Sequence, residues 1–111
     1  MKPVKSLTCA TFLGCLAMAA SAVTPAHAQD VSGQLGKYGC VACHAADKKL
    51  VGPSFKDIAA KYRGNAGAEK QLAAKVKNGG SGVWGSVPMP PNPTVPDTDL
   101  TAMVRSILSQ K

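Results

Sequence analysis

The chain has 111 residues and a formal net charge of +7, and only 5% of its residues are aromatic. This length favours one small domain near the lower limit for a self-sufficient hydrophobic core. Its basic residues form no run interleaved with aromatic side chains, which excludes nucleic-acid binding as the function.

The first 28 residues have the pattern of a cleaved secretory signal peptide. Two lysines precede an apolar stretch at 7–23, which ends at Ala26-His27-Ala28. A charged start, an apolar middle and a small-x-small exit are the parts of such a signal. A membrane anchor and a lipoprotein attached through Cys15 are weaker alternatives, because the stretch is short for a span and Cys15 lies inside it. We therefore expect a periplasmic protein with one domain at 29–111 and no stable membrane insertion after cleavage.

Cleavage after residue 28 changes the composition of the mature chain. The remaining 11 basic and six acidic residues give a net charge of +5, which favours partners with acidic docking surfaces. Cys40 and Cys43 are then the only cysteines, and His44 is the only histidine. The four aromatic residues that remain are too few to fill a core, which indicates a large buried cofactor.

The periodicity of the apolar residues predicts an all-α fold of about four helices. The first leads into Cys40 and carries Val31, Leu35 and Tyr38 on one face. The others are expected from Ser54 to Gly64, over 66–78, and from a cap at Asp97 or Thr98 onward. Met103 lies on the apolar stripe of the last helix and is expected in the core.

Residues 79–96 cannot be helical. They contain four glycines and five prolines, and proline removes the backbone donors that helices and central strands need. An irregular loop of this length in a small domain is usually functional or disordered. Trp84 and Met89 within it favour an ordered, functional loop.

The motif Cys40-Val41-Ala42-Cys43-His44 carries the strongest functional signal. Two cysteines three residues apart on a helical turn share one face, so both can reach the vinyl edge of a haem. The spacing C-x-x-C-H is the signature of haem c attachment, with the histidine beneath the iron. We predict one haem c, bound covalently to Cys40 and Cys43 and ligated by His44.

Three alternatives use the same cysteines. A disulfide oxidoreductase needs a βαβ fold, which the pattern does not predict. A zinc site would need further ligands. A structural disulfide would leave the sparse core and the long loop unexplained.

Met89 is the predicted second axial ligand. It lies between Pro88 and Pro90, which stiffen the segment and would hold the thioether in a fixed place. His/Met ligation fills both axial positions and favours reduced iron relative to a bis-imidazole site. The sequence therefore predicts an electron carrier rather than an enzyme, with other redox proteins as partners.

A haem enzyme or gas sensor with a weakly held sixth position is the main alternative function, and a disulfide module without haem is the second.

These motifs resemble the class I cytochromes c, and closely the short bacterial cytochrome c-551 group. The likeness covers nearly all of residues 30–111, with matching segments at 39–44, 51–53, 77–79, 82–85, 88–92 and 108–111. It implies a class I cytochrome c fold wrapped around one haem. No apolar surface stripe suggests a dimer, so we expect a monomer.

The resemblance also implies roles for three further residues. The Pro53 carbonyl would accept the second N–H of His44 and fix its tautomer. The Trp84 indole would donate to a haem propionate, and Asn92 would donate to the Met89 sulfur or stabilise its loop. The family implies shuttling between a membrane quinol–cytochrome c oxidoreductase and a terminal reductase, such as nitrite reductase, or an oxidase.

Charged side chains near the haem have two expected roles. Relatives often place an arginine where this chain has Lys75, and lysine lacks the fork geometry of arginine, so we expect Lys75 to be largely solvated. Partners would dock at the exposed haem edge, which apolar residues at 41, 51 and 90 would surround. The steering charges would come from the lysines at 37, 48, 49 and 77.

Overall fold

The computed structural model describes residues 31–111, and the expected signal peptide at 1–28 lies outside the described residues. The described part contains four α-helices, a short 3₁₀ helix and no strand. The elements are α1 (Val31–Lys37), η1 (Cys40–Ala42), α2 (Phe55–Tyr62), α3 (Ala68–Asn78) and α4 (Asp97–Leu108). The predicted all-α class is confirmed. Each helix within 31–111 is too short or too polar to span a membrane.

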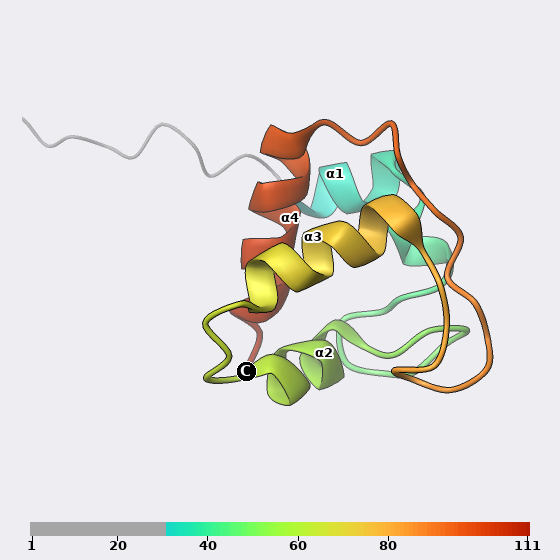
Figure 1. Cartoon of the computed structure of the whole chain (residues 1–111), viewed down its shortest axis with the longest axis vertical. Coiled ribbons are helices and arrows are strands. Elements are labelled where there is room, and N and C mark those ends of the chain that lie inside the picture. Colours follow the sequence, from blue (N-terminus) through green and yellow to red (C-terminus); the bar gives the residue numbers. More distant parts are fainter. Residues whose placement is uncertain (1–30) are drawn as a thin grey trace, which may run out of the picture.

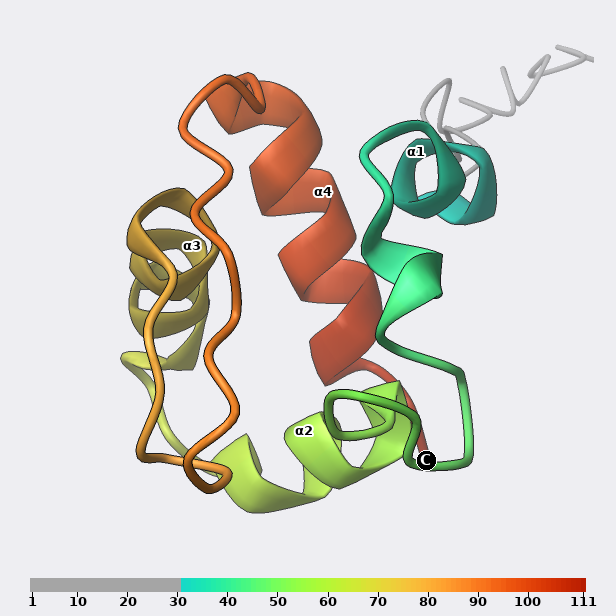
Figure 2. The same ribbon diagram turned by 90° about the vertical axis from the view of Figure 1, so that its right-hand side faces the viewer.

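Helix α4 is the central element of the fold. It contacts α1, α2 and α3, and Figure 2 shows it between α1 and α3, with α2 across one end. Val95, Leu100, Met103 and Val104 form the buried core cluster, each at most 2% exposed. Apolar side chains of α1 and α3 pack against this cluster, so burial along α4 holds the helices together.

The start of α2 follows the sequence pattern. The Ser54 hydroxyl accepts a hydrogen bond from the Asp57 N–H at 3.0 Å, which caps the helix as predicted. The Phe55 N–H donates to the Ala45 carbonyl at 2.9 Å. Because Ala45 directly follows His44, this bond ties α2 to the segment that follows the cysteine motif.

Helix α3 begins two residues later than predicted. The Asn65 side chain accepts from the Gly67 N–H at 2.9 Å, and its carbonyl accepts from the Ala68 N–H at 3.1 Å. These two bonds form a turn at 65–68, in which the Asn65 carbonyl accepts from the residue three positions on and not four, as in an α-helix. The helix therefore starts at Ala68.

The predicted side-chain cap of α4 is wrong. Pro96 occupies the N-cap position without a side-chain bond, and Asp97 is already the first helical residue. The Asp97 carboxylate instead lies 2.9 Å from the Lys77 ammonium. The Asp97 side chain, which local patterning assigned to the cap, thus forms an ion pair with a residue of α3.

Residues 79–96 form the irregular loop that the sequence predicts. Figures 1 and 2 show the loop leaving α3 toward α2 and returning alongside itself to α4. An isolated antiparallel bridge between Gly80 and Met89 joins its two limbs. The loop thus closes one side of the space between α2, α3 and η1.

Candidate haem site

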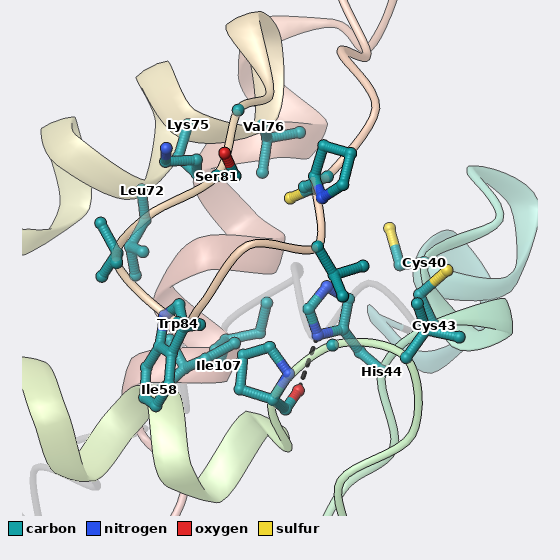
Figure 3. A pocket seen from close by; sticks show the side chains of 18 of the residues that line it. Cys40, Cys43, His44, Ile58, Leu72, Lys75, Val76, Ser81, Trp84 and Ile107 are labelled. Atoms are coloured by element: carbon teal, nitrogen blue, oxygen red, sulfur yellow. Dashed lines mark hydrogen bonds between the residues drawn. The ribbon is translucent and has the colours of Figure 1, made fainter.

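An apolar cavity opens between η1, α3 and the loop at 79–96. It contains about 1030 Å³ of empty space, including the open solvent at its mouth. Every described helix contributes to its lining. In Figure 3, Cys40, Cys43 and His44 lie on one side and Lys75 and its α3 neighbours on the other. Of the predicted site residues, the cavity lining contains Cys40, Cys43, His44, Pro53, Trp84 and Met89 but not Asn92.

The cysteine motif forms a tight helical turn. Gly39 opens it with φ +73°, in the left-handed region that glycine adopts readily. The N–H groups of Cys43 and His44 both donate to the Cys40 carbonyl, at 3.2 and 3.0 Å. The turn brings both thiols and the imidazole to the same cavity.

The thiols lack the properties of a redox or zinc site. Cys40 and Cys43 are not bonded to one another, and both are partly buried. Burial raises the pKa of the Cys40 thiol, against a smaller lowering by a backbone hydrogen bond. A reactive redox cysteine needs the opposite shift. Residues 31–111 also contain no group of three His, Cys, Asp or Glu side chains suited to a metal ion.

His44 is held in one orientation. Its Nδ1 lies 2.7 Å from the Pro53 carbonyl, the dashed contact in Figure 3. Since a carbonyl oxygen only accepts, Nδ1 carries the proton in this contact and Nε2 keeps its lone pair. The Phe55 ring stacks on the imidazole at 5.6 Å between centroids. A Cβ on Gly52 would lie 2.6 Å from His44 Cε1, so only glycine leaves room for this ring.

Met89 is fixed through its backbone. Gly80 and Met89 exchange two hydrogen bonds, with the Gly80 N–H donating at 2.9 Å and the Met89 N–H at 3.0 Å. The flanking Pro88 and Pro90 have no N–H to compete for partners. Met89 is partly buried and lines the cavity.

Asn92 and Trp84 lie on the same loop in different settings. The Asn92 amide donates to the Pro90 carbonyl at 3.1 Å, and its N–H donates to the Val76 carbonyl at 2.8 Å. Asn92 therefore contacts the backbone of the loop and of α3. Trp84 is 42% exposed at the cavity, and the Lys61 ammonium lies 5.2 Å from its ring centroid.

Lys75 and Lys77 are less solvated than the sequence analysis predicts. Lys75 lines the cavity and is only partly exposed, because it shares the inward face of α3 with Leu72 and Val76. Its ammonium would lie 3.3 Å from a Cβ on Gly80. Lys77, expected to steer partners, is bound to backbone carbonyls and to Asp97.

Sequence reasoning missed Gly52, Phe55 and Lys61 as supports of the site. Gly52 lies in one of the segments that match the cytochrome c-551 group, which was the signal available for it. The stacking of Phe55 and the placing of Lys61 over Trp84 depend on chain folding and have no local signature.

The cavity suits a flat, largely apolar group with a charged edge. Its walls are mainly aliphatic and aromatic, two thiols lie on one turn, and Lys75 supplies a positive charge. Within 31–111 only eight apolar residues are buried, which is a small core for this length. Six large apolar side chains are exposed, at 41, 50, 51, 83, 84 and 87. A haem in this position would complete the core, so the residues present fit the group.

Known proteins resemble this chain in sequence and in structure. The family model of cytochrome c matches residues 28–111. Cytochrome c-551 of Pseudomonas aeruginosa is 58% identical over 73 residues, which are 66% of this chain and 69% of that protein. Cytochrome c-552 of Nitrosomonas europaea is 49% identical over 94 residues, covering 84% of this chain and 91% of the relative.

The likeness extends to solved structures. The crystal structure of Nitrosomonas europaea cytochrome c552 has a TM-score of 0.69 and 49% identity, covering 72% of this chain and 99% of that one. Residues 31–111 form four α-helices, without strands, around an apolar cavity, and together with these matches they establish the fold as that of a class I cytochrome c. The chain belongs to the cytochrome c family of electron-transport proteins, as a member of the c-551 type with one covalently attached haem c.

Proposed function

We propose that this chain is a periplasmic electron carrier that transfers single electrons between redox proteins and is not an enzyme. Its haem c would be held by thioether bonds to Cys40 and Cys43. His44 and Met89 would be the axial ligands. When bound, the haem supplies one iron that exchanges a single electron between its ferrous and ferric states.

One observation carries the proposal. The cavity is lined by a tight turn bearing Cys40, Cys43 and His44 and also by Met89, whose backbone is fixed on a separate loop. These two segments are 45 residues apart in sequence from His44 to Met89, yet they share one cavity. A thiol pair and two axial donor types at one apolar cavity suit haem c with both positions filled.

The protein's part in electron transfer is to keep its ligand side chains still. The Pro53 carbonyl holds the proton on His44 Nδ1, which orients Nε2 and strengthens it as a donor. Gly80 holds the Met89 backbone through both the N–H and the carbonyl of Met89. Ligands that move little between the two oxidation states keep the reorganisation energy of electron transfer small. Trp84 would donate to a propionate, and Asn92 supports the loop.

We propose docking through the cavity mouth. Val51 lines the cavity and is 56% exposed, and Val41, on the cysteine turn, is 52% exposed; both would meet the partner surface. Lys48 and Lys49 are exposed and would steer an acidic partner, so the transfer rate should fall as salt rises. The proposed partners are a membrane quinol–cytochrome c oxidoreductase and a terminal reductase, such as nitrite reductase, or an oxidase.

We also propose export and a monomeric state. Residues 1–28 would be removed as a signal peptide, which would leave residues 29–111 as the single domain in the periplasm. The N-terminal sequence and mass of the periplasmic protein test the cleavage site. A mass near one chain in sedimentation equilibrium tests the monomer.

The decisive experiment is the visible spectrum of the exported protein in both oxidation states. We expect sharp α and β bands after reduction, and a weak far-red band of the ferric form that Met89→Ala abolishes. Met103→Leu is the matched control, because Met103 is a core residue 2% exposed and the swap preserves volume. This control should retain the far-red band.

Other spectra would point to the rival functions. Haem bands without the far-red band would remove Met89 as ligand, and carbon monoxide binding to the reduced protein would then favour a sensor or enzyme. A protein without haem, from cells able to attach it, would leave only a disulfide module. Haem staining after denaturing electrophoresis separates covalent from absent haem.

A further inference from the structure

Lys77 binds three acceptors at the far end of the loop that carries Met89. Its ammonium lies 2.6 Å from the Val95 carbonyl and 3.4 Å from the Pro93 carbonyl. The same ammonium lies 2.9 Å from Asp97 Oδ1. The Lys77 side chain is 29% exposed and its bond to the Val95 carbonyl is partly buried, whereas the Asp97 side chain is 90% exposed. The Val95 carbonyl is therefore the main partner of the ammonium, and the ion pair with Asp97 lies at the surface.

The segment between Met89 and α4 cannot hold itself by backbone pairing. Four of the seven residues at 90–96 are proline, which keeps its carbonyl but has no N–H. The segment therefore has more backbone acceptors than donors. Donors must come from elsewhere, and Lys77 is a charged donor that reaches two of these carbonyls.

The contacts of Lys77 connect the loop to the core. Val95 is 2% exposed and belongs to the core cluster, while Asp97 is the first residue of α4. Lys77 itself lies in the last turn of α3. One ammonium thus joins the end of α3, the returning loop and the start of α4.

Met89 consequently lies between two attachment points of the loop. On its N-terminal side, Gly80 exchanges two backbone hydrogen bonds with it. On its C-terminal side, Asn92 donates to Val76 at 2.8 Å and Lys77 holds the following segment. If the second attachment were lost, the loop would remain tied at Gly80 but could move away from α3.

We propose that Lys77 is a positioning residue for Met89, holding the returning loop against α3 so that the thioether stays on the iron. The proposal rests on the proposed function, in which Met89 is an axial ligand. It gives Lys77 a role distinct from steering partners, for which its bound ammonium is poorly available. Lys70 on the same helix is exposed and provides a matched control.

The test uses the ferric holoprotein and imidazole as a competing ligand for the iron. The far-red band reports Met89 ligation, and its loss with added imidazole gives a midpoint concentration. Lys77→Met should lower this midpoint about tenfold, since hydrogen bonds to charged groups are among the stronger ones. Lys70→Met should leave the midpoint unchanged, and Lys77→Arg should restore most of it by keeping the charge and the donors.

A second readout does not involve the iron. Hydrogen exchange at the Asn92 N–H should be faster in Lys77→Met than in Lys70→Met, with the amides of central α4 unchanged. A general loss of stability would instead speed exchange throughout α4. That pattern would overturn the positioning role.

Other outcomes separate this proposal from the proposed function. Equal imidazole midpoints in Lys77→Met and Lys70→Met would overturn the role of Lys77 while leaving Met89 as ligand. A wild-type protein without the far-red band would overturn both. If Lys77→Met does not fold, Lys77→Gln decides, because it removes the charge and shortens the donor that reaches the Val95 carbonyl: a midpoint lowered at least about twofold supports the proposal, and a wild-type midpoint overturns it.

Discussion

No side chain fits between Gly79 and Pro91. A Cβ on Gly79 would lie 2.7 Å from the Pro91 nitrogen and 2.9 Å from the Pro90 carbonyl carbon. Gly79 also ends α3 with φ +65° and ψ −154°, a backbone conformation that is essentially restricted to glycine. Contact between the end of α3 and the segment just after Met89 therefore depends on a glycine at this position.

Gly79→Ala should both destabilise the protein and weaken Met89 ligation. The positive-φ backbone costs about 1–3 kcal/mol for alanine, and the overpacking against backbone adds about 1–3 kcal/mol. The free energy of unfolding in urea measures the first effect, and the far-red band of the ferric form measures the second.

Gly64→Ala is the matched control for this glycine. Gly64 has φ +78° and nothing within 4 Å of a Cβ, so it shares the positive φ without the clash. We expect a smaller loss of stability and an unchanged far-red band. A weakened band in both variants would show that the contact with Pro91 is not the cause.

Gly52→Ala should displace the His44 imidazole. The new Cβ would lie 2.6 Å from Cε1 and 3.0 Å from Nδ1, so the ring must move and its 2.7 Å contact with the Pro53 carbonyl must weaken. Because that contact strengthens His44 as a donor, we expect a higher reduction potential and a loss of about 1–3 kcal/mol of stability. Potentiometric titration and urea unfolding measure the two effects.

Gly36→Ala serves as its control, because nothing lies within 4 Å of a Cβ at this α1 position. Its potential should match that of the wild type. An unchanged potential in Gly52→Ala would mean that the ring accommodates the methyl group without losing the Pro53 contact.

The features predicted correctly from sequence are those decided by neighbours in the chain. Apolar periodicity located the helices, and Ser54 caps α2 because its partner, Asp57, is three residues away. The all-α fold class is likewise confirmed. The proline and glycine content at 79–96 also excluded a helix correctly.

The features predicted wrongly are decided by contacts between distant segments. Asp97 pairs with Lys77 instead of capping α4, and the two residues are 20 positions apart. The crowding of His44 against Gly52 similarly requires the folded loop. Lys75 is a different case: it lines the cavity because it shares the inward face of α3 with Leu72 and Val76, which a helical wheel of α3 would have shown.

Stability should depend on pH through the pair of Glu69 and Arg105. The Arg105 guanidinium donates to the Glu69 carboxylate at 2.9 and 3.1 Å, and this hydrogen bonding, with the nearby positive charge, lowers the pKa of Glu69. A lowered pKa in the folded state stabilises the fold above the ordinary value of 4.5, and this contribution is lost as the pH falls through the folded pKa.

Glu69→Gln should therefore lower stability at neutral pH and approach the wild type in acid. The pair is exposed, so we expect a small difference. Urea unfolding at several pH values from neutral to about pH 3 measures it. Asp47→Asn, at an exposed position in the loop before α2, is the control for removing a carboxylate. A Glu69→Gln deficit that persists undiminished in acid would show that packing, and not the charge, accounts for the effect.

Lys75 should raise the reduction potential of the bound haem. Its ammonium lies at the cavity lining, beside Gly80, where a positive charge disfavours the more positive ferric iron. Lys75→Met should therefore lower the potential, by on the order of tens of millivolts for a charge partly screened by solvent. Lys70→Met removes the same charge from an exposed position on the same helix and should change the potential much less.

Potentiometric titrations at low and high salt separate the two variants, because screening reduces the effect of an exposed charge more than that of a partly buried one. Equal shifts in both variants would mean that the Lys75 ammonium is as well solvated as that of Lys70, despite its place at the cavity.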